Sequence, residues 1–157
     1  MREAFATARR SFDAGGGPFG AVIVRAERIV GSGMSLAEAL LDPTAHAEVQ
    51  AIRAAAQTLE RIDLSDCVAY SSGEPCPMCL SAFYWARIGT VYYGSTAHDA
   101  TRFGFEDLYL YEELKKPASS RAVVCHQLLR QEARSILSSA ARERTYRSFL
   151  PPDWPPG

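Results

Sequence analysis

Apolar side chains recur along the chain with two different spacings, and these spacings predict its helices and strands. Apolar residues three or four positions apart, bounded by proline, glycine or capping residues, predict helices over residues 2–14, 43–59, 77–86 and 131–149. Short runs of β-branched and aromatic residues predict strands over residues 19–24, 29–31, 67–72, 90–93 and 121–128. Residues 96–119 are rich in aromatic and acidic side chains, and we expect them to form a loop.

The order of these elements predicts the fold class. Two strands joined as a hairpin come first, and the order αβαβ, loop, βα follows. Such an order is typical of an α/β protein, here with a five-stranded mixed sheet that carries helices on both faces. We find no repeat or internal linker, so residues 1–157 are expected to form a single domain with a proline-rich tail at 150–157.

Two short motifs contain the residues of a catalytic zinc site. They are His46-Ala47-Glu48 and Pro75-Cys76-Pro77-Met78-Cys79. An imidazole and two thiolates are good zinc ligands, and a catalytic zinc leaves its fourth position to water. Glu48 lies close enough to His46 to move the protons of that water, whose pKa zinc lowers to about 7. The pattern H-x-E followed by P-C-x-x-C is typical of zinc-dependent nucleobase deaminases.

Both motifs are expected at the starts of helices. Asp42-Pro43 has the form of a capping residue followed by a proline in the first helical position, which places His46 in the first turns of that helix. Pro77 predicts the start of the next helix, with Cys76 at its cap and Cys79 in its first turn. A helix N-terminus lowers the pKa of a thiol and so favours the thiolates that a metal needs.

A structural zinc site, or no zinc at all, is the alternative. A structural site closes its fourth position with a protein ligand, which Cys67 or Cys125 would have to supply. Both lie in apolar, strand-like segments, where a buried thiol commonly serves only packing. We therefore expect both cysteines to be core residues and Zn²⁺ to be a catalytic cofactor.

Composition narrows the classes of partner. Lys plus Arg total 17 and Asp plus Glu total 18, which gives a formal net charge of −1 and a pI near 6.3. This balance disfavours nucleic acid, whose binding proteins usually carry a basic patch, and favours a small neutral substrate. No apolar run approaches the 18 residues of a membrane span, so no membrane partner is expected. Metal-bound thiolates suit a reducing compartment, and we expect a cytoplasmic location.

Five segments carry a likeness that extends over nearly the whole chain: residues 17–21, 42–48, 74–80, 84–87 and 104–107. Together they resemble the bacterial guanine deaminases, which belong to the cytidine-deaminase-like zinc hydrolases. The first and third segments occur throughout that superfamily, whereas the last two are more typical of guanine deaminases. The resemblance implies a three-layer αβα fold, one zinc ion per subunit, and a homodimer whose C-terminal segments are exchanged.

The resemblance also implies contacts with the substrate. Phe19 is expected to stack on a base, with core packing as its alternative, and the backbone N–H of Ala47 to bind a substrate carbonyl. Asp107 is expected to accept hydrogen bonds from a purine edge and to relay a proton to the departing ammonia, with Glu106 as its substitute. Paired acidic residues in a loop are more often simply solvated.

Two positions bear on substrate choice and on closure of the site. Related enzymes place an asparagine eleven residues before the histidine, and this chain has Ser35 there, whose hydroxyl can make only part of an amide's hydrogen bonds. Ser35 therefore leaves the identity of the base open. Trp154 is the only aromatic residue of the tail, and it is expected either to close the pocket, from the partner subunit, or to belong to a frayed terminus.

The function expected from these features is hydrolytic deamination of guanine at C2, which yields xanthine and ammonia. Another small base or nucleoside, such as guanosine, cytosine or an aminotriazine, is the alternative within the fold. A tRNA adenosine deaminase of the same superfamily is disfavoured by the low pI. A zinc-stabilised module without catalysis is the alternative outside enzymes.

Overall fold

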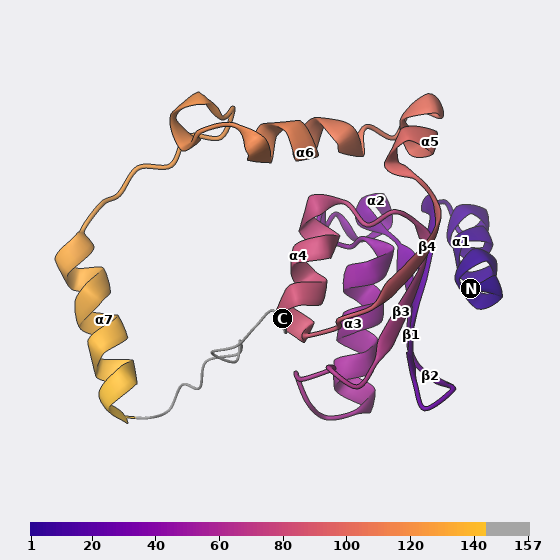
Figure 1. Cartoon of the computed structure of the whole chain (residues 1–157), viewed down its shortest axis with the longest axis horizontal. Helices are drawn as coiled ribbons and strands as arrows, with labels where there is room; N and C mark the ends of the chain where they lie inside the picture. Colours follow the sequence, from indigo (N-terminus) through magenta and orange to yellow (C-terminus); the bar gives the residue numbers. More distant parts are fainter. Residues whose placement is uncertain (144–157) are drawn as a thin grey trace. The chain divides into compact units, whose positions relative to one another are not determined.

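A hairpin of β1 (Gly17–Arg25) and β2 (Arg28–Ser35) begins a mixed sheet in the computed structural model, which describes residues 1–143. The strand order is β2-β1-β3-β4, where β3 is Val68–Gly73 and β4 is Val91–Ser95 (Figure 1). β1 runs antiparallel to both β2 and β3, whereas β4 runs parallel to β3. The predicted hairpin and mixed sheet are therefore confirmed.

Helices cover both faces of this sheet. α1 (Arg2–Asp13) packs on one face, and α3 (Ala47–Thr58) packs on the other beside α4 (Pro77–Ala86) (Figure 1). All of these elements belong to the first of two units of the chain, Met1–Glu112, and the second unit is Glu113–Gly157. The first unit thus has the expected three layers, helix, sheet and helices.

Small residues set the distance between the layers. A Cβ atom at Gly20 would overlap the backbone of α1, and one at Gly33 would overlap the backbone of α3 at Ala47 and Ala51. Larger side chains fill the remaining space, and Ile23 and Phe83 are almost fully buried. Each such side chain contributes about 1.5–3 kcal/mol on burial, so these layers are held together mainly by apolar contacts around the sheet.

The helix predicted from residue 43 begins four residues later, at Ala47. Asp42 caps a turn instead of the helix, because its Oδ1 accepts hydrogen bonds from the backbone N–H of Thr44 at 2.8 Å and from the Thr44 hydroxyl at 2.6 Å. Aspartate forms such local turns readily, and here the turn prevents the first helical hydrogen bonds. His46 is consequently the N-cap residue of α3.

The loop predicted over residues 96–119 contains helical segments. They are α5 (Ala97–Arg102), α6 (Asp107–Lys115) and a short 3-10 turn, η1 (Ala118–Ser120). Thr96 and Asp99 form a reciprocal capping box at the start of α5, in which each side chain accepts from the other residue's backbone N–H. That pattern, Thr-x-x-Asp, is visible in the sequence and would have predicted the helix.

The fifth strand predicted over residues 121–128 is wrong for the described part of the chain. These residues have no ladder partner, and the side chains of Val123 and Val124 are 76% and 64% exposed. A strand needs a neighbouring strand for its backbone hydrogen bonds, and the second unit holds only η1 and α7 (Arg130–Glu143) besides the end of α6. Cys125 is therefore exposed instead of packed in a core, which corrects a second expectation.

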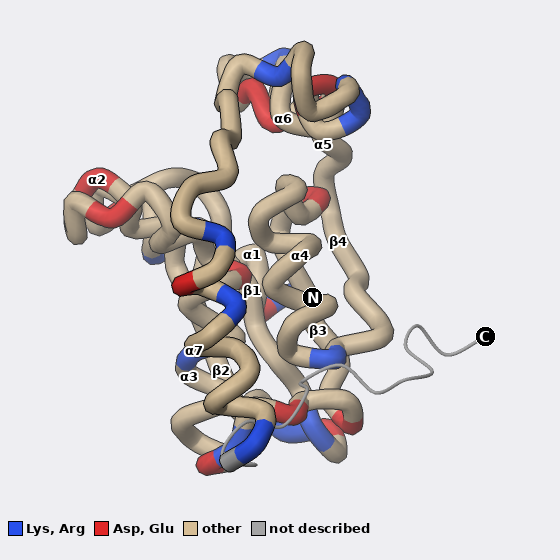
Figure 2. The backbone as a smooth tube through the Cα atoms, turned by 90° about the vertical axis from the view of Figure 1, so that its left-hand side faces the viewer, with Lys and Arg blue, Asp and Glu red and all other residues tan. Residues whose placement is uncertain are grey.

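The remaining predictions hold in outline. Cys67 is buried as expected, and α7 covers the described part of the helix predicted over residues 131–149. Lysine and arginine are interspersed with aspartate and glutamate along the described chain (Figure 2). Within residues 1–143, no helix has both the length and the apolar character that crossing a membrane requires.

Candidate metal-dependent active site

Two helix starts bring the predicted metal ligands together. His46 is the N-cap residue of α3 in an extended backbone conformation, and Cys76 is the N-cap residue of α4 in a similar one. Pro77 occupies the first turn of α4, and Cys79 lies in the same turn, as the sequence predicted. Because both residues stand at the starts of helices that contact one another, and neither side chain caps its own helix, His46 and Cys76 can face one another.

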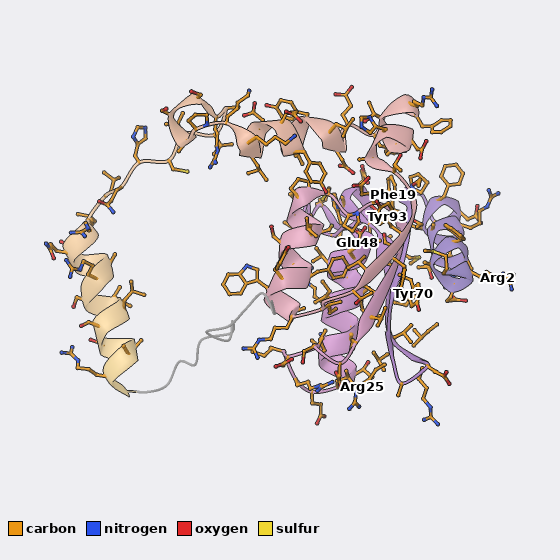
Figure 3. The ribbon with its side chains drawn as sticks, in the orientation of Figure 1. Arg2, Phe19, Arg25, Glu48, Tyr70 and Tyr93 are labelled. Atoms are coloured by element: carbon orange, nitrogen blue, oxygen red, sulfur yellow. The ribbon has the colours of Figure 1, made fainter. Side chains whose placement is uncertain are left out.

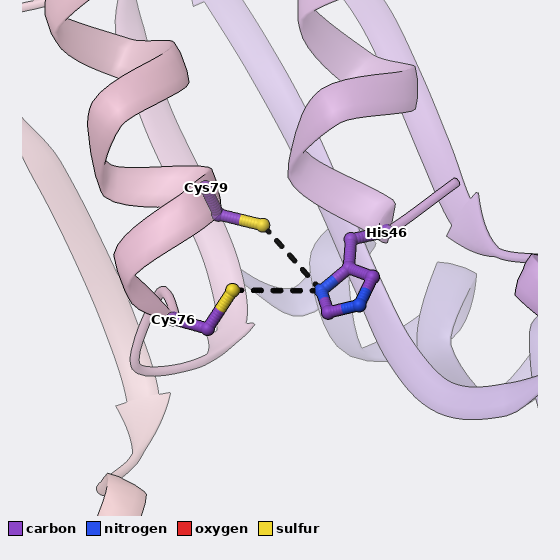
Figure 4. Close-up of side chains that lie close together, drawn as sticks. All are labelled: His46, Cys76 and Cys79. Atoms are coloured by element: carbon purple, nitrogen blue, oxygen red, sulfur yellow. Dashed lines mark hydrogen bonds between the residues drawn. The ribbon is translucent and has the colours of Figure 1, made fainter. Parts of the chain in front are cut away.

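The three donor atoms are spaced as a single metal ion requires. The Sγ atoms of Cys76 and Cys79 both lie 3.6 Å from Nδ1 of His46 (Figure 4). All three donors lie within 4.8 Å of one another. A tetrahedral zinc with Zn–S of about 2.3 Å and Zn–N of about 2.0–2.1 Å holds its sulfur and nitrogen ligands about 3.6 Å apart. The distances therefore fit one zinc ion.

The electrostatics of the two thiols point the same way. Hydrogen bonding with Cys79, and then with His46, lowers the pKa of Cys76 to about 4. For Cys79, the hydrogen bond with Cys76 is the main cause that raises the pKa well above its ordinary value, and burial is the second. A buried site cannot hold two uncompensated thiolates side by side. A divalent cation removes that conflict, because its charge compensates both sulfurs.

Glu48 lies in the first turn of α3 with its side chain buried. Only 6% of the residue is exposed, and burial raises the pKa of its carboxyl group. The hydroxyl of Ser71, on β3, donates a 2.8 Å hydrogen bond to Oε1 of Glu48. Figure 3 shows Glu48 pointing from α3 toward the sheet, at the same end as Phe19. A buried carboxyl group with a raised pKa suits the transfer of protons.

A pocket of about 130 Å³ opens in front of these residues. Its walls come from β1, β2, α2 (Ala37–Leu40), the start of α3, and the segments before α4 and α6. The lining residues are Gly17, Phe19, Ser35, Ala37, Glu38, His46, Ala47, Glu48, Glu74, Cys76, Phe105 and Asp107. Among them are four carboxylates but no lysine or arginine. The pocket therefore disfavours an anionic group and offers acceptors to N–H donors.

Five of the predicted site residues meet in this pocket besides the ligands. Phe19, Ser35, Ala47, Glu48 and Asp107 all line it. Glu106, the predicted substitute for Asp107, is exposed and is not part of the lining. Trp154 lies outside the described residues.

Phe19 takes part in both of the contacts considered for it. Its ring lines the pocket, and it also packs against the apolar core of the first unit. Phe105 meets it edge to face, with ring centroids 5.1 Å apart. The face of an aromatic ring at a pocket wall can stack on a flat base.

Asp107 is the predicted acidic residue that reaches the pocket from α6. Burial is the main cause that raises the pKa of its carboxyl group, and the negative charge of Cys76 adds to it. A carboxyl group in this position can hold a proton at higher pH than a solvated aspartate. Asp107 and Glu48 thus supply two acidic groups with raised pKa values to one pocket.

Five lining residues were not among the predicted site residues: Gly17, Ala37, Glu38, Glu74 and Phe105. Ala37 and Glu38 belong to no motif, whereas Gly17 and Phe105 lie in the segments 17–21 and 104–107 that carry the resemblance. Glu74 stands directly before Pro75-Cys76, and its position in the motif could have drawn attention to it. Its Oε2 accepts a 2.8 Å hydrogen bond from the backbone N–H of Ala97, which joins the segment before α4 to the start of α5.

Known proteins share both the motif and the fold. Residues 1–95 match the family described as the cytidine and deoxycytidylate deaminase zinc-binding region. Guanine deaminase of Bacillus subtilis is 46% identical over 129 residues, which are 82% of this chain and 83% of that protein. A tRNA-specific adenosine deaminase of Aquifex aeolicus is 33% identical over 138 residues, which are 88% of this chain and 89% of that protein.

A solved structure extends the comparison to the three-dimensional level. The X-ray structure of guanine deaminase from Bacillus subtilis matches with a TM-score of 0.89 at 41% identity and covers 95% of this chain and 96% of that one. The His/Cys/Cys group described above agrees with the zinc-binding character of the matched family. The chain therefore belongs to the cytidine and deoxycytidylate deaminase family of zinc-dependent enzymes, with guanine deaminase of Bacillus subtilis among its relatives.

Proposed function

We propose that this enzyme converts guanine and water to xanthine and ammonia. The observation that carries the proposal is the buried carboxyl group of Glu48 beside the three metal donors, in a pocket without basic residues. The relatedness to guanine deaminase of Bacillus subtilis supports guanine as the base.

In this proposal His46, Cys76 and Cys79 hold one zinc ion. The ion makes water a nucleophile at neutral pH. Nδ1 of His46 is the donor atom that faces both sulfurs, and the other ring nitrogen remains available for a hydrogen bond that fixes the ring. The pocket lies on one side of the three donor residues, because His46 and Cys76 line its wall whereas Cys79 is fully buried.

Glu48 moves the protons of the reaction. Its carboxylate accepts a proton from the attacking water and delivers it to the ring nitrogen N3 beside the attacked carbon C2. It then takes the second proton from the hydroxyl now on C2 and gives it to the departing amine, so that C2 becomes a carbonyl and ammonia leaves. Ser71 holds one carboxyl oxygen by its 2.8 Å hydrogen bond, and the carboxyl group also interacts with the thiol of Cys79, one of the metal donors. Burial raises the pKa of this carboxyl group, so it binds a proton more readily than a solvated glutamate does.

The pocket walls orient the base. We assign the backbone N–H of Ala47 to a substrate carbonyl, the ring of Phe19 to a face of the base, and Asp107 to N–H groups on the purine edge. Guanine offers several N–H donors, which match the carboxylates of the lining. Ser35, at the end of β2, lines the same pocket, and we assign it a contact with the substrate through its short hydroxyl.

A free base is favoured over a nucleotide or RNA. Each phosphate would bring negative charge toward Glu38, Glu74 and Asp107 without a basic partner in the lining. The relatedness to tRNA-specific adenosine deaminases makes tRNA the competing substrate that needs a direct test. Guanosine, cytosine and an aminotriazine are the small competitors.

The experiment is ammonia release by the zinc-loaded enzyme from guanine, guanosine, cytosine, an aminotriazine and an adenosine-34 tRNA transcript. We expect guanine to have the highest kcat/KM, with xanthine as the product seen by chromatography. Glu48→Gln enzyme serves as the control for contaminating deaminases. Preferred turnover of the tRNA or of another base would refute guanine as the substrate.

We further propose that the enzyme acts as a homodimer in the cytoplasm. β4 has a strand partner on one side only among the described residues, and Tyr92 and Tyr93 of this strand are about half exposed. The apolar residues at 121–128 are exposed in their own unit and have strand-forming composition. Exchange of residues 121–128 between subunits would give β4 and this segment a strand partner in the other subunit.

Light scattering of the full chain, and of a variant with Val123→Glu and Val124→Glu, tests this arrangement. It predicts a dimer for the full chain and a monomer for the variant.

A further inference from the structure

A hydrogen bond joins α6 to the segment that carries the first cysteine ligand. The hydroxyl of Tyr111 donates to the backbone carbonyl of Pro75 over 2.6 Å, and Pro75 directly precedes Cys76. Tyr111 is partly buried, and burial raises the pKa of its hydroxyl, so the group remains a donor. Both residues belong to the first unit of the chain.

The geometry of α6 connects this bond to the pocket. Asp107 lies in the first turn of α6 and Tyr111 one turn later. Residues four apart share one face of a helix, so the bond from Tyr111 fixes the rotation of the face that carries Asp107. Asp107 itself lines the pocket, and no hydrogen bond to its carboxylate is among the interactions that the structure shows for the described residues.

A second contact fixes the chain on the N-terminal side of Asp107. Phe105, two residues earlier, meets the ring of Phe19 edge to face at 5.1 Å. The residues between the two contacts include the start of α6, and Gly104 before them has a φ of +87°. Asp107 thus stands between an aromatic contact to β1 and a hydrogen bond to the segment before α4.

We propose that Tyr111 is a positioning residue for the deamination reaction: its bond to Pro75 holds the Asp107 carboxyl group at the pocket. The inference rests on the proposed function, in which Asp107 binds the base. A displacement of about 1 Å in a group that orients substrate can cost about 10²-fold in rate. Without the bond, α6 can turn about its axis, and Asp107 then leaves the lining.

The test is a double-mutant cycle between Tyr111 and Asp107 on the zinc-loaded full chain. Tyr111→Phe removes only the hydroxyl, and Asp107→Asn removes the charge that the hydroxyl is proposed to position. We expect Tyr111→Phe alone to lower kcat/KM by about 10- to 100-fold. In the Asp107→Asn background the same change is expected to have less than a twofold effect, because nothing remains to be positioned.

Two controls separate positioning from other roles. Tyr109→Phe removes a hydroxyl from the same helix, where Tyr109 is 54% exposed, and is expected to leave kcat/KM unchanged. Zinc content of Tyr111→Phe is expected to remain one per chain. Equal losses from Tyr111→Phe in both backgrounds, or loss of zinc, would show that Tyr111 acts on the fold or on Cys76 and would overturn the proposal.

Hydrogen exchange gives a readout that does not depend on activity. The amides of residues 105–111 are expected to exchange faster in Tyr111→Phe than in wild type or Tyr109→Phe, while those of α3 are unchanged. Unchanged exchange over residues 105–111 would contradict the proposal. If wild-type enzyme turns over another base in preference to guanine, the proposed function fails, and the same cycle on that base still decides whether Tyr111 positions Asp107.

Discussion

Ser71 donates its hydroxyl to Oε1 of Glu48 over 2.8 Å, and this bond joins the middle of the sheet to the first turn of α3. Both residues are buried, Ser71 completely. A buried carboxyl group has few rotamers available once one oxygen is held. The bond therefore directs the second oxygen toward the metal donors and the pocket, which is the orientation that proton transfer requires.

Ser71→Ala is expected to destabilise the protein and to slow catalysis together. The substitution leaves a buried carboxyl oxygen without its donor, at a cost of about 1–3 kcal/mol in the free energy of unfolding. Urea titration and kcat measure the two effects. Ser81→Ala removes an exposed hydroxyl that donates to the carbonyl of Pro77, and it is expected to change neither quantity appreciably. Equal effects of the two substitutions would contradict a special role for Ser71.

Glu48→Gln is expected to abolish most activity while the protein stays folded. Glutamine keeps the size and one acceptor but cannot accept and deliver protons. General acid–base groups contribute about 10²–10⁴-fold, and because Glu48 is assigned more than one transfer, a loss near the upper limit is expected. Zinc content, measured by metal analysis, should be unchanged. Activity within a few-fold of wild type would remove Glu48 from the mechanism.

Cys79→Ala is expected to lose zinc. Cys79 is one of three donors within 4.8 Å of one another, and two protein ligands hold zinc much less tightly than three. Cys67→Ala is the matched control, since Cys67 is also buried but does not belong to the group. Inductively coupled plasma analysis after dialysis is expected to find zinc in the control and none in Cys79→Ala. Full occupancy in Cys79→Ala would refute the ligand assignment.

Ser35→Asn is expected to change the ranking of substrates. Ser35 lines the pocket, and an amide offers both a donor and an acceptor where the hydroxyl is short. A polar contact that a substrate must satisfy discriminates strongly between bases. The ratio of kcat/KM for guanine to that for guanosine measures the change. Ser32→Asn, on the exposed part of the same strand, is the control. An unaltered ratio would mean that position 35 does not contact substrate.

Acid is expected to weaken the fold through Asp66. Hydrogen bonding from Arg25, and further that from Arg61, lowers the pKa of Asp66 to about 2. Because an unfolded aspartate has a pKa of about 3.9, the unfolded chain binds more protons between these two values. The stabilisation is therefore complete above about pH 4 and is lost as the pH falls toward 2.

The urea midpoint as a function of pH measures this contribution. Wild type is expected to lose stability between about pH 4 and 2 more steeply than Asp66→Asn, because the variant has no titrating group at position 66. Asp13→Asn removes an exposed carboxylate paired with Arg9 within α1 and serves as the control. Parallel curves for wild type and Asp66→Asn would contradict the role of Asp66.

The parts of the fold that the sequence predicted are those governed by local pattern. The hairpin, α1, β3 and α4 were found close to their predicted bounds, because each has a regular apolar spacing and a glycine, proline or turn at its end. The metal group was predicted because its ligands form two short motifs. His46 and Cys76 lie 30 positions apart, yet each motif defines its own half of the site.

The misplaced elements depended on contacts that spacing does not encode. Asp42 could cap a helix or a turn, and its bonds to Thr44 decided for the turn. Residues 121–128 have the composition of a strand, but a strand exists only where another strand offers hydrogen bonds. Glu38 reaches the pocket from the short helix α2, whose position depends on tertiary packing, so no motif could have identified it.

The distribution of the metal donors over two helices makes the metal a ligand of the folded state. Cys76 and Cys79 remain neighbours when the chain unfolds, but His46 does not stay beside them, so the unfolded chain holds the ion less tightly. By mass action, free zinc at 100 times its dissociation constant stabilises the native state by about 2.7 kcal/mol. The melting temperature of this protein is then a function of the zinc concentration around it, and a chelator lowers it before any substrate is involved.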